Sequence, residues 1–224
     1  MMSAASPATS VRSAGPSNPT ANLRFGELAS EERLRNAVAA LEQNGISTTV
    51  AATRAEAVRA VLDRIPLGSE VLDAPSQTLV ALGLDAALAD PARFHNIRAE
   101  LMRLREEKKS DAQRKLGASP DVIVGSVHAI TEKGQVVIAS ATGSQLGPYV
   151  SGAGKVIWVA GTQKIVADLD AAFQRVEEYT LPRESERAMK AYGFASFVAK
   201  LLVVNREFTP GRIHLVLLRE NLGF

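Results

Sequence analysis

The fold is decided by Val122-Ile123-Val124-Gly125-Ser126-Val127-His128 and by two similar runs further along the chain, Val136–Ala139 and Val156–Val159. Each run is apolar and rich in β-branched residues, which is typical of strands buried on both faces of a helix-covered sheet. Small polar residues follow the runs, as they do at the strand ends where α/β proteins build ligand sites. The sequence therefore predicts a single α/β domain with a largely parallel or mixed sheet flanked by helices.

Helical patterns and further strands surround these runs. Apolar residues three and four apart indicate helices, and short β-branched segments indicate strands. The predicted helices begin after Ser30 and stop at Asn44-Gly45, run from the Thr53/Glu56 capping box to Pro66, end at Leu82 before Gly83, cover about 94–116, 146–150 and 164–179, and begin again after Pro182. The further predicted strands are 46–50, 70–73, 201–205 and 213–218.

The composition excludes several classes of function. The 224 residues are 46% hydrophobic and 22% charged, which fits one globular domain with a sizeable core. There is no cysteine, so the chain itself has no disulfide, thiolate nucleophile or cysteine-held iron–sulfur cluster. The net charge is only +2 and the signs are interleaved, so we expect no nucleic-acid partner. No apolar run approaches the ~20 residues that span a bilayer, so we expect no membrane partner.

The first 24 residues differ from the rest of the chain. They are rich in Ser, Ala, Pro and Thr, and their only charges are Arg12 and Arg24. They lack the apolar central segment of a secretory signal, and their composition favours disorder. We therefore predict a disordered tail over 1–24, an α/β domain over 25–224 and a cytoplasmic location.

Four polar segments at predicted strand ends are candidates for ligand binding. Hydroxyl groups and free N–H groups at such positions can bind an anion, although Ser76 can also act only as a helix cap and the third segment only as a turn. The candidate ligand-binding residues are Ser76, Gln77 and Thr78; Gly125 and Ser126; Thr142, Gly143, Ser144 and Gln145; and Gln163 and Lys164.

Two residues are candidates for catalysis. Glu132 can act as a general base, and His128 can act as an acid or base. An alternative for Glu132 is a simple hairpin turn, because Thr131-Glu132-Lys133-Gly134 lies between two predicted strands and ends in glycine. The three histidines show no metal-binding spacing, and neither a phosphate loop nor a G-x-G-x-x-G motif is present. The sequence identifies no cofactor.

Several segments between residue 68 and the end of the printed sequence resemble the LUD-domain family, the group that includes the lactate-utilisation protein C. They are LDAPSQTL at 72–79 with GL at 83–84, DVIVGSVHAIT at 121–131, EKGQ at 132–135, SATGSQL at 140–146, GTQKIV at 161–166 and ENLGF at 220–224. The resemblance covers about two-thirds of the chain. It implies a fold similar to that of the ribose-phosphate isomerase, glucosamine-phosphate deaminase and CoA-transferase group.

The resemblance also implies a role in lactate or related organic-acid metabolism. In the transferases of that fold group a glutamate forms a covalent intermediate, which is a further role for Glu132. One departure concerns the turn before Thr78, where Ala74-Pro75-Ser76-Gln77 replaces the Gly-Gly-Ser of better-known relatives. Pro75 donates no N–H to an anion, so the transfer of phosphate or CoA binding to this chain is weakened.

Three functions stay open at this point. The first is an accessory or binding protein for a small anionic metabolite. The second is an isomerase, deaminase or acyl/CoA transferase that uses Glu132 together with the Ser/Thr/Gln loops. The third is a subunit of an oxidoreductase complex, in which partner proteins hold the iron–sulfur clusters.

Overall fold

A computed structural model describes residues 20–224. Most of the predicted disordered tail, residues 1–19, lies outside the described residues. Leu23 and Arg24, the last two residues of the predicted tail, belong to the short 3-10 helix η1 (Leu23–Gly26), which Asn22 caps. The side-chain amide of Asn22 also donates to Glu178 Oε2 at 2.8 Å. In the described range, no helix is both long and apolar enough to cross a bilayer.

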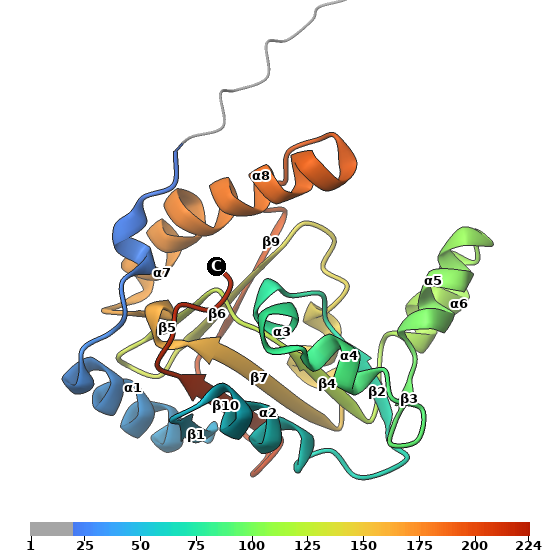
Figure 1. The fold of residues 1–224 in the computed structure, drawn as a ribbon, viewed down its shortest axis with the longest axis horizontal. Helices are drawn as coiled ribbons and strands as arrows, with labels where there is room; N and C mark the ends of the chain where they lie inside the picture. The colour runs from blue at the N-terminus through green and yellow to red at the C-terminus, as the bar shows by residue number, and fades with distance from the viewer. Residues whose placement is uncertain (1–19) are drawn as a thin grey trace, which may run out of the picture.

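The main sheet has six strands, and all of its neighbouring strands are parallel (Figure 1). In spatial order they are β1 (Ser47–Ala51), β10 (Ile213–Leu218), β7 (Lys155–Gly161), β4 (Val122–Gly125), β2 (Glu70–Asp73) and β3 (His95–Asn96). The chain forms a single α/β domain, which confirms the predicted fold class. Since parallel neighbours share one direction, the loops that follow all six strands meet at one edge of the sheet.

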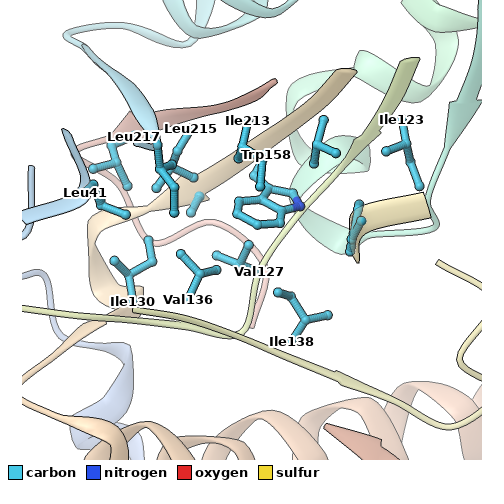
Figure 2. Close-up of a cluster of buried hydrophobic side chains, with 14 of the residues drawn as sticks. Leu41, Ile123, Val127, Ile130, Val136, Ile138, Trp158, Ile213, Leu215 and Leu217 are labelled. Carbon is cyan, nitrogen blue, oxygen red and sulfur yellow. The ribbon is translucent and has the colours of Figure 1, made fainter. Parts of the chain in front are cut away.

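Side chains alternate between the two faces of this sheet, as the two-residue period of a strand requires. In β7, Val156 and Trp158 face one buried cluster, and Ile157 and Val159 face another. The cluster around Trp158 lies between the parallel sheet and a smaller second sheet (Figure 2). Three helices cover the opposite face: α2 (Arg54–Leu62), α3 (Gln77–Leu82) and α4 (Leu84–Leu88).

The second sheet has the strand order β8-β5-β6-β9. Its strands are β8 (Ile165–Val166), β5 (Ala129–Thr131), β6 (Val136–Ser140) and β9 (Lys200–Val204). One face packs with α1 (Glu31–Gln43) against the parallel sheet. The other face is covered by α7 (Leu169–Arg175), by the π-helical turn η4 (Val176–Thr180) and by α8 (Leu181–Tyr192) beyond it (Figure 1).

Three predicted helices were wrong in their limits. The helix that Thr53 caps, α2, ends at Leu62 rather than at Pro66. The predicted helix over 94–116 is instead β3, α5 (Arg98–Glu106) and α6 (Ser110–Leu116), because the chain turns between the two helices at Lys108, whose φ is +55°. The predicted 146–150 helix is a π-helical turn, η2 (Pro148–Gly152), displaced by two residues.

The prediction of one helix over 164–179 was also wrong. The 3-10 turn η3 (Thr162–Lys164) and strand β8 come first, because β8 pairs with β5. The helix α7 begins only at Leu169, where Asp168 caps it by accepting a hydrogen bond from the Ala171 N–H at 2.9 Å. Lys164 is therefore the last residue of the 3-10 turn between β7 and β8 and does not lie in the first turn of an α-helix.

Candidate functional site

A cavity of about 900 Å³ opens at the edge of the sheet where the parallel strands end. Ala74-Pro75-Ser76 follows β2, Ser126 follows β4, and Lys164 lies just after β7. The loop after β6 and residues around α8 complete the wall. Ligand sites of α/β proteins lie at this edge, outside the carboxyl ends of the strands. The candidate ligand-binding residues of the sequence analysis were chosen at these same strand ends.

Lys164 is the most deeply buried charged group that reaches the cavity, with 1% of its surface exposed. Its ammonium Nζ donates to Thr78 Oγ1 at 3.1 Å, to Ser126 Oγ at 3.0 Å and to the Val127 carbonyl at 2.9 Å. Thr78 belongs to α3, whereas Ser126 and Val127 follow β4. The Lys164 side chain therefore connects its own turn, η3, with the start of α3 and with the residues after β4, which are far apart in the sequence.

The two hydroxyl groups around Lys164 have acceptors of their own. Thr78 Oγ1 donates to the Leu222 carbonyl at 3.1 Å. Ser126 Oγ donates to the Val159 carbonyl at 2.7 Å. With both hydroxyl protons used, each oxygen offers a lone pair to Lys164, as a hydroxyl group can do. The amine thus has three acceptors for its three protons, and all three acceptors are neutral.

Among the described residues, no carboxylate lies within ion-pair distance of this amine. None of the ion pairs within residues 20–224 includes Lys164. Burial lowers the pKa of Lys164 well below its ordinary value of 10.5, and the positive charge of Arg175 lowers it further. In its protonated form Lys164 is therefore a buried cation without a counter-ion among the described residues, which is costly for the protein alone.

Arg175 is a second buried cation next to this wall, and it is completely buried in α7. Its Nη1 donates to the carbonyl of His128 and to Thr180 Oγ1, the latter at 3.2 Å. Its guanidinium carbon lies 5.0 Å from the centre of the Tyr179 ring. Burial lowers the pKa of Arg175 to about 10, which leaves it charged at neutral pH. In the described part of the chain, Nη2 has no hydrogen-bond partner.

His128 lines the cavity as a neutral ring. Its Nδ1 accepts a hydrogen bond from the backbone N–H of Ala139 at 3.0 Å, so in the neutral ring Nε2 carries the proton. Burial lowers the pKa of His128 to about 3, and the charges of Lys164 and Arg175 contribute to this shift. At neutral pH His128 can therefore donate one hydrogen bond but carries no charge.

Three acidic residues, Asp73, Asp85 and Glu184, also line the cavity. Asp73 at the end of β2 is 4% exposed, and its carboxylate pairs with Arg98 Nη1 at 3.1 Å. The Asn96 side-chain amide also donates to this carboxylate, at 3.0 Å. Because Arg98 compensates Asp73, this pair adds no net charge to the cavity.

The polar loop after β6 lines the cavity and is also a turn with its own hydrogen bonds. The backbone N–H of Gly143 donates to Ser140 Oγ at 2.8 Å, and φ at this glycine is +83°. The backbone N–H of Ser144 donates to Thr142 Oγ1 at 3.3 Å. The ligand-site and turn interpretations of this loop are therefore compatible.

The structure brings together most of the predicted ligand-binding residues. Those that line the cavity are Ser76, Gln77, Ser126, Thr142, Ser144, Gln145 and Lys164, and the catalytic candidate His128 lines it too. Those that support the lining from behind or within the loops are Thr78, Gly125, Gly143 and Gln163. A Cβ atom on Gly125 would lie 1.8 Å from the Tyr149 hydroxyl oxygen, so only glycine fits there.

Glu132 does not join this group. It lies in the β5–β6 hairpin turn, where the N–H of Gly134 donates to the Thr131 carbonyl at 2.9 Å. Its carboxylate pairs with Arg33 of α1 at 2.6 Å, and it is not among the cavity residues. The turn interpretation of this segment agrees with the structure, and nothing here assigns Glu132 a catalytic role.

Sequence reasoning missed Arg175, Asp73 and Arg98. Arg175 lies three residues after Ala172 and four before Tyr179, all on the buried side of α7 and η4. A charged residue at such an inward position was a usable signal. Asp73, as the last residue of an apolar strand, was another.

The chain is similar in sequence to one protein family and in structure to a solved protein. Residues 34–218 match the family model described as LUD domain. No curated protein matches the chain. A solved structure of a DUF162 family protein from Deinococcus radiodurans is similar at a TM-score of 0.49 and 12% sequence identity, over 86% of this chain and 99% of that chain.

Proposed function

The chain belongs to the LUD-domain family, and from this premise we propose that it binds a small organic-acid anion in lactate or related organic-acid utilisation, as an accessory or binding protein. The binding site is the cavity at the carboxyl edge of the parallel sheet. The ligand's carboxylate takes the place of the missing counter-ion of Lys164. Support comes from the family and from the charges that line the cavity.

The observation that carries this proposal is the uncompensated charge of Lys164. A buried charge is normally paired or neutralised. Lys164 has only neutral partners, and the nearby Arg175 adds a second positive charge instead of a negative one. An anion that enters the cavity therefore gains electrostatic energy that it does not find in water, where the dielectric constant is high.

Neutral donors next to Lys164 suit a hydroxy or oxo acid. Ser126 is half-buried and lines the cavity, so a carboxylate oxygen can replace its hydroxyl oxygen as an acceptor for Lys164. The ring of His128 has one N–H to donate, and its low pKa keeps this donor neutral. A 2-hydroxy or 2-oxo oxygen beside the carboxylate matches such donors.

An enzyme based on Glu132 has no support from this geometry, since its carboxylate is paired with Arg33 outside the cavity. Association with an iron–sulfur protein stays a prediction from the sequence.

The proposal is tested by calorimetric titration and thermal unfolding with lactate, pyruvate and the uncharged analogue lactamide. We expect lactate or pyruvate to bind and to stabilise the fold by about 2.7 kcal/mol at a hundredfold excess over Kd. We expect lactamide to bind at least about tenfold more weakly, because it has no charge to offer Lys164.

A matched pair of variants assigns the effect to Lys164. Lys164→Met removes the charge from the cavity and is expected to abolish acid binding. Lys155→Met removes the lysine at the first residue of β7, the strand that precedes Lys164, where its Nζ lies 3.4 Å from the Arg64 carbonyl. This variant is expected to bind the acids normally. Equal binding of lactamide and lactate, or full binding by Lys164→Met, would show that the proposed function is wrong.

A further inference from the structure

The cavity is much larger than a three-carbon acid. Its volume of about 900 Å³ falls near the top of the range of roughly 300–1,000 Å³ that is usual for drug-sized ligands. Even if each of the roughly six heavy atoms of lactate is given the ~30 Å³ of a water molecule, lactate fills only about a fifth of this space. The remaining volume has a chemistry of its own.

Other residues of the cavity wall are apolar and exposed. Val80 of α3 is 55% exposed and Met102 of α5 is 46% exposed. Tyr192 at the end of α8 is 63% exposed, and Phe197 in the segment after it is 59% exposed. These residues come from separate parts of the fold, since α3 and α5 flank the parallel sheet and α8 covers the second sheet (Figure 1). Exposed apolar side chains that gather around one cavity mark a binding surface.

The aromatic side of this wall is held in place by the protein. The ring of Tyr192 stacks with Phe194 at 6.0 Å between centroids and an interplanar angle of 28°. The guanidinium of Arg187 lies 5.4 Å from the Tyr192 ring, and Glu184 fixes it by two hydrogen bonds of 2.7 Å. Phe197 takes part in no ring contact found within residues 20–224, so its face is open to a ligand.

The charges of the lining limit the ligand to one negative group. Arg187 is paired with Glu184, and Arg98 is paired with Asp73. Since His128 is neutral at physiological pH, Lys164 is the one cation of the cavity lining without an acidic partner in the described structure. A phosphate group is best bound by several cationic hydrogen-bond donors, and in this lining only Lys164 is a cation without an acidic partner in the described structure.

Building on the proposed function, we propose that the ligand is an aryl-substituted 2-hydroxy or 2-oxo acid, a monoanion with an aromatic ring at the end away from its carboxylate. The carboxylate lies at Lys164, and the aromatic ring lies against Phe197 and Tyr192, with Val80 and Met102 near its edge. A flat ring suits this wall better than an alkyl chain, because aromatic rings gain from offset stacking in addition to the area that they bury.

Calorimetric titration with 3-phenyllactate, lactate and phosphoenolpyruvate tests this inference. We expect 3-phenyllactate to bind at least about tenfold more tightly than lactate, from the apolar area that its ring removes from water. Phosphoenolpyruvate is expected to bind no better than lactate, since its second anionic group finds no free cation.

Two phenylalanine variants locate the ring. Phe197→Ala is expected to remove most of the preference for 3-phenyllactate and to leave lactate binding unchanged. Phe208→Ala is the matched control, because Phe208 is 96% exposed and lies outside the cavity lining. Both positions are exposed, so both variants should fold, and their thermal unfolding midpoints verify this.

The outcomes separate this inference from the proposed function. If lactate binding depends on Lys164 but 3-phenyllactate binds no more tightly, or if Phe197→Ala keeps the preference, the aryl acid is wrong and the anion site stands. If phosphoenolpyruvate binds best, the ligand is not a monoanion and the inference is also wrong. If neither lactate nor 3-phenyllactate binds, or both bind Lys164→Met normally, the proposed function and this inference fail together.

Discussion

Each of the two edges of the parallel sheet has a basic residue with a largely buried side chain, but only one of the two residues forms an ion pair within residues 20–224. At the edge where the strands begin, Arg212 precedes β10 and its side chain is 9% exposed. Its Nη1 pairs with Glu207 at 2.7 Å, its Nε donates to the Ala153 carbonyl at 3.1 Å, and its Nη2 donates to the Pro148 and Tyr149 carbonyls, both at 3.1 Å. At the edge where the strands end, Lys164 is still more buried, and no acidic residue between 20 and 224 pairs with it.

This difference indicates which edge holds the fold together and which edge binds. A buried charge with a matched carboxylate and full hydrogen bonding is a stable part of the fold, although a well-packed apolar substitute can do as well. A buried charge without a counter-ion costs stability, and proteins often accept such costs where a site needs a particular group for its function. The comparison therefore predicts that substitutions at the two edges have opposite effects on stability and on binding.

The largest expected effect on stability is that of Arg212→Met. It leaves the Glu207 carboxylate, 11% exposed, without its cation, and three backbone carbonyls lose a donor. Removing one partner of a buried pair typically costs about 3–5 kcal/mol. Urea denaturation should show this loss in the unfolding free energy, while Kd for the acid ligand stays unchanged.

The control for this variant is Arg219→Met. Arg219 pairs with Glu31 through two hydrogen bonds of 2.8 and 3.0 Å, but both side chains are well exposed. Exposed ion pairs contribute little to stability, so we expect no clear change in the urea midpoint. If Arg212→Met is as mild as Arg219→Met, the first edge is not the stabilising one.

Two histidines are expected to have an intermediate effect on stability, through its pH dependence. One of them, His128, lies at the edge where the strands end, and the other, His214, lies at the edge where they begin. Burial lowers the pKa of His128 to about 3 and that of His214 to about 4. Below pH 6.5 the unfolded chain binds protons that the folded protein does not bind. The stability that each neutral histidine provides above pH 6.5 is therefore lost as the pH falls toward the folded pKa, by at most about 1.4 kcal/mol per pH unit for His128.

Asparagine variants distinguish the two histidines. His128→Asn keeps an acceptor for the Ala139 N–H, and His214→Asn keeps a partner for Thr49 Oγ1, which lies 3.0 Å from the His214 ring. Both variants should lose less stability than the wild type between pH 6.5 and 4 in thermal unfolding. Only His128→Asn should also change Kd for the acid at pH 7. A change in Kd in His214→Asn alone would contradict the assignment of the binding edge.

Much of the fold was predictable, because strands and caps depend on neighbouring residues. The limits of β2 follow from the residues 70–73 alone, and Ser30 caps α1 as predicted, with its Oγ accepting from the Arg33 N–H at 3.3 Å. The helix predicted over 164–179 failed because Ile165 and Val166 fit both the helical period and a strand. Their pairing with β5 decides between the two, and the sequence does not show it.

The candidate site was predictable residue by residue but not as an arrangement. Polar residues after buried strands identified Ser126 and Lys164, because parallel strands end at one edge. The contact of Lys164 with Thr78 joins residues 86 positions apart, so neither its burial nor its lack of a counter-ion follows from spacing. Glu132 was a catalytic candidate because a carboxylate can act as a general base. Its ion pair is with Arg33 of α1, which lies 99 positions earlier, so the pair cannot be inferred from spacing.

Among the substitutions of buried groups, Lys164→Met is expected to have the smallest effect on stability, and it is the sharpest test of the comparison. The substitution removes a buried charge but also removes the shorter of the two hydrogen bonds to the Val127 carbonyl, and these two effects oppose each other. The hydroxyl groups of Thr78 and Ser126 keep their bonds to Leu222 and Val159. We therefore expect the unfolding free energy at pH 7 to change by less than about 1 kcal/mol, or to rise.

The pH dependence of the same variant provides a second measurement. Burial lowers the pKa of Lys164 in the folded protein. Below pH 10.5 the unfolded chain therefore holds the proton of this amine more firmly than the folded protein does. The wild type should therefore gain stability relative to Lys164→Met as the pH rises from 7 toward 10, when both are unfolded in urea. A loss of several kcal/mol at pH 7, as expected for Arg212→Met, would mean that Lys164 stabilises the fold as Arg212 does. The contrast between the two edges, and with it the reason to place an anion at Lys164, would then disappear.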